Sequence, residues 1–311
     1  MSTLRVGVIG AGFFGSRHAQ NYAALDGAAL VAVCDADPTV AAAVTAQYGG
    51  DAVTDPAALL GRVDAVSIAT PTAGHHALGR LFLDAGVPVL MEKPIAATVD
   101  EADDLIAAAD RAGVALQIGH LERYNSAFQA LTQATAGARL IEARRVGPYR
   151  ARGTDVSVVL DLMIHDLDLV LTLAGAAPVA VTATGGPVFS QAEDFAQAHL
   201  RFADGLQATV TASRVAVAQD RTLAIHHRGR VITADLGTSR LITAEPSGPD
   251  VPDPVTVTET AYTHGNTLAR QLTAFLAAIR GESAVPVDGR AGRDALALAR
   301  TIEGRIANGG A

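Results

Sequence analysis

Three glycines near the start of the chain have a spacing that could bind phosphate. Gly10, Gly12 and Gly15 form the pattern G-x-G-x-x-G directly after a short apolar run. The first glycine permits a tight turn, the second lets the backbone approach a pyrophosphate, and the third lets a helix pack closely. The following helix offers free N–H groups and the positive end of its dipole. We therefore expect a dinucleotide-binding loop, with Phe13 and Phe14 among its cofactor-binding residues.

An acid stands where such a loop requires one. Asp35 ends the second apolar run, 20 residues after Gly15. A carboxylate there accepts hydrogen bonds from the adenosine ribose and repels a 2′-phosphate. No arginine follows Asp35 to hold a 2′-phosphate, so NAD is favoured over NADP as the cofactor. The alternative is a glycine-rich turn with an unrelated aspartate, which would not need the strand–loop–helix context found here.

A second group of residues could move a proton. Asp161 and His165 are four residues apart in an expected helix and so lie on one face. Oxidation of a secondary alcohol needs a base for the hydroxyl proton, and histidine suits that task near neutral pH. An isolated Asp–His pair at this spacing is also typical of a helix surface, but here it follows a dinucleotide loop. Asp166 and Asp168, on the same helix, are expected to be caps or surface charges.

Two pairs of adjacent histidines could suggest a metal site. They are His75-His76 and His226-His227. Adjacent side chains diverge on a helix and face opposite sides of a strand. No Cys-x-x-Cys or His-Glu-x-x-His pattern accompanies them, so we expect no metal.

The elements that must position these residues begin with an alternating pattern. Five short apolar runs are expected to be strands, at 4–9, 29–34, 65–69, 87–91 and 114–118. The stretches between them have helical spacing, and Thr98 with Glu101 has the pattern of a capping box. Strands that are apolar on both faces and alternate with helices indicate a parallel sheet covered on both sides. The predicted fold class is an α/β, doubly wound Rossmann domain over residues 1–121.

The pattern changes after residue 121. Strands are expected at 140–146, 179–184, 196–202, 206–213, 222–227, 230–234 and 240–243, with a loop or edge at 245–255. Helices are expected at 124–133, 160–173, 267–280 and 289–306. Successive hairpin turns indicate an open, mainly antiparallel sheet. Residues 122–311 are therefore expected to form an α+β domain for substrate binding and oligomerisation.

Composition limits the class of protein. The 311 residues carry a net charge of −8, which gives no general attraction to nucleic acid or an anionic membrane. Cys34 is the single cysteine, so no internal disulfide can form. The chain starts without a signal-peptide pattern and has no window of about 18 uncharged apolar residues. A cytoplasmic location is expected.

Several motifs in order resemble the Gfo/Idh/MocA oxidoreductase family. They are the glycine loop, Thr70-Pro71 with His75, Glu92-Lys93-Pro94, and Asp161 with His165. The resemblance implies an active site between the two domains, in which His165 is the acid/base, Asp161 assists it and Lys93 contacts the reacting hydroxyl and the cofactor. It also implies that Thr70, Pro71, His75 and Glu92 belong to the cofactor site. Finally, it implies a Lys93–Pro94 bond that is often cis.

The family commonly forms homodimers or homotetramers through its C-terminal sheet. A strand face that would suit such a contact consists of Leu206, Ala208, Val210 and Ala212. The same face would equally suit packing on the domain's own helices. The sequence therefore leaves both arrangements open.

The substrate is expected to be a sugar. Arg123-Tyr124-Asn125 resembles the family branch that acts on UDP-N-acetylhexosamines, oxidising the 3-hydroxyl, and implies that these residues bind substrate. Five arginines follow and could hold a diphosphate: Arg139, Arg144, Arg145, Arg150 and Arg152. Arg144 and Arg145 must point to opposite faces of a strand, and Arg145 is preferred, with Arg150 next. The alternative is that all five are solvated charges.

Two other functions remain open from the sequence. One is a dehydrogenase of a free polyol or sugar such as myo-inositol or glucose. The other is a non-catalytic, nucleotide-sensing regulator on the same scaffold, which would not need Lys93, Asp161 and His165.

Overall fold

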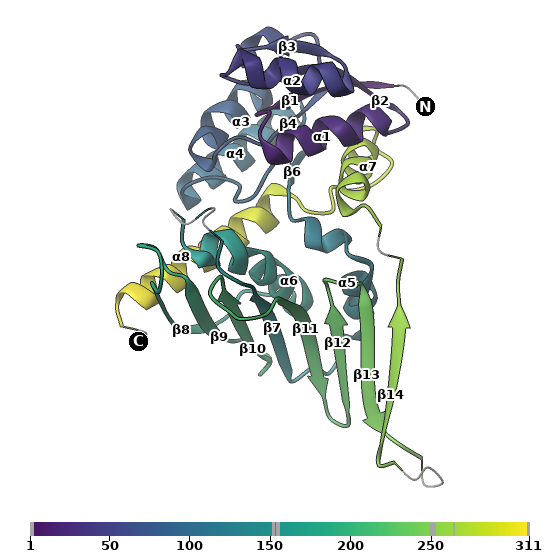
Figure 1. Cartoon of the computed structure of the whole chain (residues 1–311), viewed down its shortest axis with the longest axis vertical. Coiled ribbons are helices and arrows are strands. Elements are labelled where there is room, and N and C mark those ends of the chain that lie inside the picture. The colour runs from purple at the N-terminus through teal and green to yellow at the C-terminus, as the bar shows by residue number, and fades with distance from the viewer. Residues whose placement is uncertain (1–2, 151–152, 154–155, 249–252, 264, 310–311) are drawn as a thin grey trace. The chain divides into compact units, whose positions relative to one another are not determined.

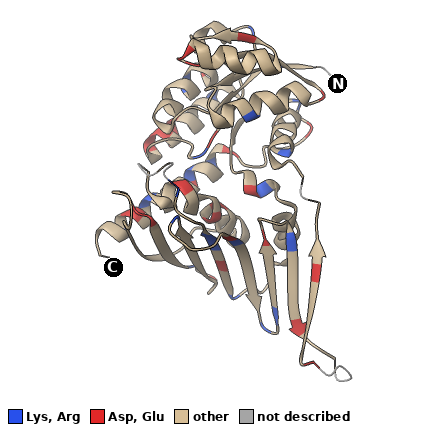
Figure 2. Ribbon diagram, viewed as in Figure 1, with Lys and Arg blue, Asp and Glu red and all other residues tan. Residues whose placement is uncertain are grey.

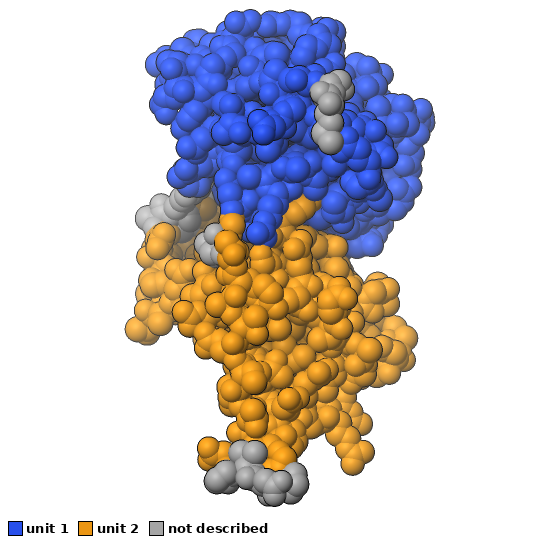
Figure 3. Space-filling view, turned by 90° about the vertical axis from the view of Figure 1, so that its right-hand side faces the viewer, with its two compact units in different colours: residues 1–121, 266–296 blue, residues 122–265, 297–311 orange. Residues whose placement is uncertain are grey.

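The computed structural model describes residues 3–150, 153, 156–248, 253–263 and 265–309. The chain divides into two compact units (Figure 3). Unit 1 comprises residues 1–121 and 266–296, and unit 2 comprises residues 122–265 and 297–311. Charged residues of both signs are scattered over both units (Figure 2). Within the described residues, no helix is both long and apolar enough to cross a bilayer.

Unit 1 is built on a six-stranded parallel sheet with the strand order β3-β2-β1-β4-β5-β6 (Figure 1). Its strands are β1 (Leu4–Ile9), β2 (Ala28–Cys34), β3 (Asp51–Val53), β4 (Ala65–Ile68), β5 (Val89–Met91) and β6 (Leu116–Ile118). Its helices are α1 (Phe13–Ala24), α2 (Pro38–Tyr48), α3 (His75–Leu83), α4 (Val99–Ala112), α7 (Thr267–Ile279) and the first part of α8 (Gly289–Ala307), with 3₁₀ turns η1 (Pro56–Leu59) and η2 (Thr72–Gly74). This order confirms the predicted doubly wound fold, whose ligand crevice lies where the order reverses, between β1 and β4.

Helix α7 returns to unit 1, although the sequence analysis placed 266–296 in the second domain. Its apolar side chains Leu272 and Phe275 are fully buried in the same cluster as Val6 and Val8 of β1. An amphipathic helix joins the sheet that can bury its apolar face, whichever segment precedes it in the chain. Residues 266–296 therefore complete the Rossmann unit.

Unit 2 contains an eight-stranded sheet in the order β14-β13-β12-β11-β7-β10-β9-β8 (Figure 1). Its strands are β7 (Leu140–Val146), β8 (Ala180–Gly186), β9 (Phe195–Arg201), β10 (Gln207–Ser213), β11 (Asp220–His227), β12 (Arg230–Asp235), β13 (Arg240–Pro246) and β14 (Val255–Ala261). Its helical segments are η3 (Leu121–Tyr124), α5 (Ser126–Leu131), η4 (Thr132–Ala134), η5 (Val159–Met163) and α6 (Ile164–Ala174), followed by the end of α8. The open, mainly antiparallel sheet is confirmed.

One strand pair in this sheet is parallel. β7 and β10 run side by side, with Arg145 opposite Ala212 and Val146 opposite Ser213. The carboxyl ends of these two strands therefore meet at one edge. The residues that follow each strand are thus close in space although about 70 residues apart in the sequence.

The helices α5 and α6 cover one face of this sheet (Figure 1). Ala208, Val210 and Ala212 point to that face and are at most 1% exposed within the single chain. They pack under the chain's own helices, which decides between the two arrangements left open above. The opposite face carries polar side chains such as Thr209, Thr211 and Gln197.

Candidate active site

The glycine loop has the geometry that phosphate binding requires. Gly10 has a φ of +89°, and a Cβ there would lie 2.7 Å from the Ala69 carbonyl oxygen. A Cβ on Gly15 would collide with the Gly10 carbonyl. A Cβ on Gly12 would meet nothing within 4 Å, so this position faces open space. Helix α1 begins there with no side-chain cap and no acidic residue in its first turn, which leaves its N–H groups and dipole available to an anion.

Asp35 lies directly after β2 and is hydrogen-bonded to the glycine loop. Its Oδ2 accepts a hydrogen bond from the Ala11 N–H at 2.7 Å, and its Oδ1 accepts one from the Asp37 N–H at 3.0 Å. An ionised carboxylate has further acceptor capacity on both oxygens. Asp35 can therefore fix the loop and still accept a ribose hydroxyl.

The surroundings fit a dinucleotide. A cavity of about 700 Å³ opens beside Gly12, lined by residues of α1 and α2 that include Arg17 and Tyr48. Across the crevice, Thr70 follows β4. Among the described residues its hydroxyl has no hydrogen-bond partner although it is shielded from solvent. An open glycine loop, a ribose acid and an unsatisfied hydroxyl together suit NAD.

His75 joins two of the turns at this edge of the sheet. The ring is 1% exposed and lies between two carbonyl oxygens, that of Thr70 at 2.9 Å from Nε2 and that of Pro94 at 2.9 Å from Nδ1. The Lys93–Pro94 peptide is cis, as the family resemblance implied. Both ring nitrogens face backbone carbonyls, so His75 ties together the turns that follow β4 and β5.

Glu92 is also turned inward. Its carboxylate is hydrogen-bonded to the fully buried ring of His18, with 3.0 Å between Oε1 and Nε2, and it accepts the Lys93 N–H at 3.3 Å. A Cβ on Gly119 would lie 2.9 Å from this carboxylate, so a larger residue there would displace Glu92 from its place beside His18. Glu92 therefore fixes the turn that presents Lys93 at the carboxyl end of β5. Sequence reasoning did not single out His18, whose position on the buried face of α1 was its only signal.

In unit 2, Asp161 and His165 lie on one continuous helical segment. Residues 159–163 form a π-helical turn, η5, that leads directly into α6. π-helical turns inside helices are frequent at functional sites. Both side chains are partly exposed, whereas Met163 and Ile164 between them are buried. The segment thus presents the acid and the imidazole on one accessible face.

Asp161 borders a cavity of about 210 Å³ in unit 2. Arginines dominate its charged lining, and the full set of lining residues is Arg145, Val146, Gly147, Pro148, Arg150, Asp161, Leu162, Ser213, Arg214, Gln219 and Arg221. The carboxyl ends of β7 and β10 form one wall, which follows from their parallel pairing.

Arg145 lies in the wall of this cavity and forms ion pairs with two carboxylates of the protein. Its Nε and Nη2 donate to both oxygens of Asp166 at 2.9 Å, and its Nη1 donates to Glu122 at 2.8 Å. Burial alone would lower the pKa of Arg145, but the two carboxylates outweigh it and raise that pKa, so the guanidinium stays charged. Three of its donors are thus used inside the protein. Asp166 is 1% exposed, so the expectation of a surface charge or cap there was wrong.

The other residues expected to bind substrate are occupied in the same way. Arg123 forms a two-bond ion pair with Asp168, each bond 2.7 Å long, and Asp168 is 1% exposed, not the surface charge expected. Asn125 caps α5 through the Ala127 N–H and donates to the Leu236 carbonyl. Tyr124 is buried, and burial raises the pKa of its hydroxyl. The segment 123–125 is therefore structural in unit 2. Helix α6 buries the carboxylate of Asp168, and a buried charge needs a partner such as Arg123.

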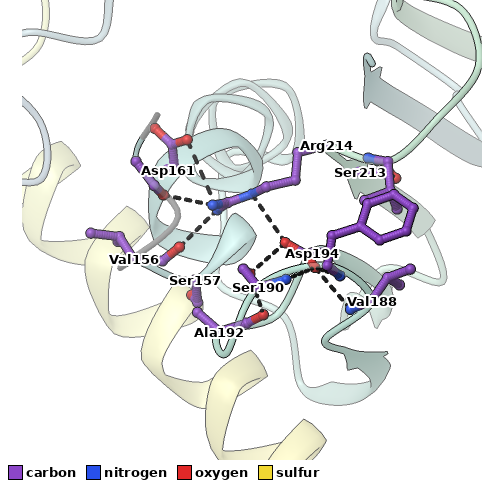
Figure 4. A network of polar contacts seen from close by, with 12 residues as sticks. Val156, Ser157, Asp161, Val188, Ser190, Ala192, Asp194, Ser213 and Arg214 are labelled. Atoms are coloured by element: carbon purple, nitrogen blue, oxygen red, sulfur yellow. Dashed lines mark hydrogen bonds and ion pairs between the residues drawn. The ribbon is translucent and has the colours of Figure 1, made fainter. Parts of the chain in front are cut away.

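Sequence reasoning missed a second buried arginine, Arg214, which follows β10. Its guanidinium is 6% exposed and donates to the carbonyls of Gly153 at 2.6 Å and Val156 at 2.7 Å. It lies between two carboxylates, Asp194 at 3.9 Å and Asp161 at 4.0 Å (Figure 4). Arg214 therefore ties the chain before η5 to the sheet and stands beside Asp161.

Asp194 anchors this network. It is fully buried, and its carboxylate accepts the backbone N–H groups of Val188, Phe189 and Ser190 as well as the Ser190 hydroxyl (Figure 4). Burial alone would raise the pKa of Asp194, but these hydrogen bonds outweigh it and hold that pKa well below its usual range. Asp194 is thus a permanent anion inside the unit.

The remaining arginines of the sequence analysis lie apart from these pairs. Arg144 points to the opposite face of the sheet and pairs with Asp220 at 3.1 Å, both partly exposed. Arg139 and Arg150 are exposed, and Arg152 lies outside the described residues. Over the part of the chain that the structure describes, no three His, Cys, Asp or Glu side chains are grouped so as to hold a metal ion.

Comparisons with known proteins agree with this geometry. Residues 4–120 match a model described as "Oxidoreductase family, NAD-binding Rossmann fold", and residues 127–232 match the Gfo/Idh/MocA C-terminal domain. The chain is 40% identical over 305 residues, 97% of each protein, to a UDP-N-acetylglucosamine 3-dehydrogenase of Acidithiobacillus ferrooxidans. The solved structure of that enzyme is similar with a TM-score of 0.93, 38% identity and 98% of each chain covered.

A second relative acts on a different kind of substrate. The chain is 30% identical over 315 residues to an inositol 2-dehydrogenase of Rhizobium meliloti, covering 96% of this chain and 95% of that enzyme.

Proposed function

This chain belongs to the Gfo/Idh/MocA oxidoreductase family and is an NAD-dependent dehydrogenase acting on CH–OH groups; from that premise we propose that it oxidises the 3-hydroxyl of a UDP-N-acetylhexosamine. The observation that carries the proposal is the likeness to the UDP-N-acetylglucosamine 3-dehydrogenase over 97% of both chains. A cavity beside Asp161 lined by four arginines supports it, because a nucleotide-sugar brings a diphosphate and a free polyol does not.

When bound, NAD supplies the acceptor for the hydride. The residues proposed for its site are Gly10, Gly12, Phe13, Phe14, Gly15, Asp35, Thr70, Pro71, His75, Glu92 and Lys93. The loop binds the pyrophosphate through backbone N–H groups, and Asp35 accepts hydrogen bonds from the hydroxyl groups of the adenosine ribose. His75 and Glu92 contribute by fixing the turns around Thr70 and Lys93.

Three side chains are proposed to carry the chemistry. His165 removes the proton of the reacting hydroxyl, as a base with a pKa near neutrality does efficiently. Asp161, one turn earlier on the same helix, holds the substrate or orients the imidazole. Lys93, fixed at the end of β5, stabilises the negative charge that develops on the hydroxyl oxygen.

We also propose that the protein is a homo-oligomer that uses the helix-free face of the sheet in unit 2. The support is a face on which Phe195, 39% exposed, lies among threonines, and on which no helix packs within the described part of unit 2. Light scattering coupled to size exclusion measures the mass directly. A mass of one chain, 31.8 kDa, at micromolar concentration would exclude the oligomer.

A substrate panel tests the proposed function. Purified protein with NAD is given UDP-N-acetylglucosamine, UDP-N-acetylgalactosamine, UDP-glucose, myo-inositol and glucose, and NADH formation is followed at 340 nm. We expect turnover of a UDP-N-acetylhexosamine and little or none of the free polyols. Turnover of myo-inositol with no activity toward any UDP-sugar would show that the second relative describes this chain better. No turnover at all would favour a sensing role.

A further inference from the structure

The four arginines around the cavity of unit 2 are of two kinds. Two are buried and paired, and two are exposed and unpaired, although all of them line the same 210 Å³ space as Asp161. A buried guanidinium with partners inside the protein holds the structure, whereas an exposed guanidinium without partners is either a solvated charge or available to a ligand.

Arg145 and Arg214 are the structural pair. Arg145 is 5% exposed and donates to Asp166 and Glu122, and Arg214 is 6% exposed and donates to two backbone carbonyls beside Asp194. Removing either would leave buried carboxylates or carbonyls without their donor, which is costly for folding. Their charge is already balanced inside the protein.

Arg150 and Arg221 differ in each of these respects. Both are exposed, and within the described residues neither guanidinium has a hydrogen-bond or ion-pair partner. Arg221 lies opposite Arg145 in the register of β11 and β7, so both point to the same face of the sheet. Its neighbour Asp220 pairs with Arg144 instead.

The carboxylates near Arg221 are committed elsewhere. Asp166 interacts electrostatically with Arg221, but both of its carboxylate oxygens accept hydrogen bonds from Arg145. The two cations line a cavity whose carboxylate, Asp161, lies 4.0 Å from Arg214, and among the described residues no ion pair joins either of them to a carboxylate.

We propose that Arg150 and Arg221 bind the diphosphate of the nucleotide-sugar, with the Gln219 amide as a neutral donor beside them. This inference rests on the proposed function and replaces Arg145 as the diphosphate ligand. A guanidinium can offer two parallel donors to phosphate oxygens. The cavity is smaller than the roughly 300 Å³ at which sites for whole drug-sized ligands begin. It therefore holds the charged part and the adjoining sugar, and the sugar comes next to Asp161.

Charge-removing variants test the proposal on the NAD-saturated enzyme. Arg221→Gln and Arg150→Gln should each raise the KM for UDP-N-acetylglucosamine and the inhibition constant of UDP about tenfold to a hundredfold, as expected for one charge-assisted interaction. The double variant should lose more. The KM for NAD should be unchanged, because neither arginine is among the residues proposed to bind NAD.

Matched variants separate binding from folding and from general charge effects. Arg144→Gln removes an arginine of the neighbouring strand that points to the other face, so the KM should stay at the wild-type value. Arg221→Lys keeps the charge without the planar fork and should give an intermediate KM. Equal thermal midpoints for all of these variants would show that the fold is intact. Added salt should weaken UDP binding to wild type more than to the double variant.

The outcomes distinguish two failures. If wild type turns over UDP-N-acetylglucosamine but the double variant keeps the same KM and the same UDP inhibition constant, the diphosphate lies elsewhere and the inference is wrong. If wild type neither turns over UDP-sugars nor binds UDP, the proposed function is wrong and the inference falls with it. A parallel rise in the KM for NAD would also overturn it, since the arginines would then act on the whole fold.

Discussion

The structural role of Arg123 in unit 2 can be tested quantitatively. The family resemblance makes it a substrate ligand, whereas the structure pairs it with a buried aspartate. Its Nε and Nη2 donate to the two oxygens of Asp168, which is 1% exposed, while the Arg123 side chain is 18% exposed. Arg123→Ala therefore leaves a buried carboxylate unpaired, which costs roughly 3–5 kcal/mol in known cases. Arg144→Ala breaks an exposed pair and should cost about 0–1 kcal/mol.

Urea unfolding measures the loss of stability in both variants. It is followed by far-UV circular dichroism, because the chain has no tryptophan to serve as a fluorescence probe. Replacing both partners, as in Arg123→Met with Asp168→Leu, should recover most of the lost stability, since no charge is then left buried. If Arg123→Ala lowers the free energy of unfolding by less than about 1 kcal/mol and instead raises the KM for the sugar substrate, Arg123 is a substrate ligand and not the structural partner of Asp168.

Three further predictions follow from the site. Asp35→Ala should weaken NAD binding more than tenfold while changing NADP binding less, because the ribose acceptor and the repulsion of a 2′-phosphate are lost together; tighter binding of NADP than NAD by wild type in calorimetric titration would contradict this. His165→Ala should lower turnover about 10²–10⁴-fold with NAD affinity unchanged; near wild-type turnover at pH 7 would assign the base elsewhere. Asp194→Asn should lower the free energy of unfolding, with its full effect at neutral pH. The difference in this free energy from wild type should shrink as pH falls below about 4, because a carboxyl with a lowered pKa stabilises the fold only while it is ionised. A difference that does not depend on pH would reject the role of the charge.

The Rossmann unit could be predicted because its signals are local. The glycine spacing, the acid after β2 and the capping box of Thr98 and Glu101 each depend on residues that are close in the sequence, and the capping box is present as expected. The short strand β3 was missed, because its three residues carry little apolar pattern. The return of α7 to this unit was also missed, since nothing in an amphipathic pattern says which sheet will bury it.

The interior charges of unit 2 could not be predicted for a related reason. Helical spacing points Asp166 away from His165 and brings Asp168 nearer to it. It does not show that β7 supplies Arg145 as the partner of Asp166, or that η3 supplies Arg123 as the partner of Asp168. Successive hairpins indicated a mainly antiparallel sheet, but they do not show which strands pair in parallel, so the pairing of β7 with β10 could not be predicted. That pairing is what brings Arg214 next to the cavity.

If the chain oxidises the 3-hydroxyl, the hydride passes from carbon C3 of the sugar to NAD. UDP-N-acetylglucosamine deuterated at C3 reveals this transfer when the reduced cofactor and the sugar product are analysed by mass spectrometry. We expect the deuterium to appear in the reduced cofactor and to be lost from the sugar product, and we expect His165→Ala to suppress both changes. Reduced cofactor without deuterium, or with deuterium only when another carbon is labelled, would show that C3 is not the site of oxidation.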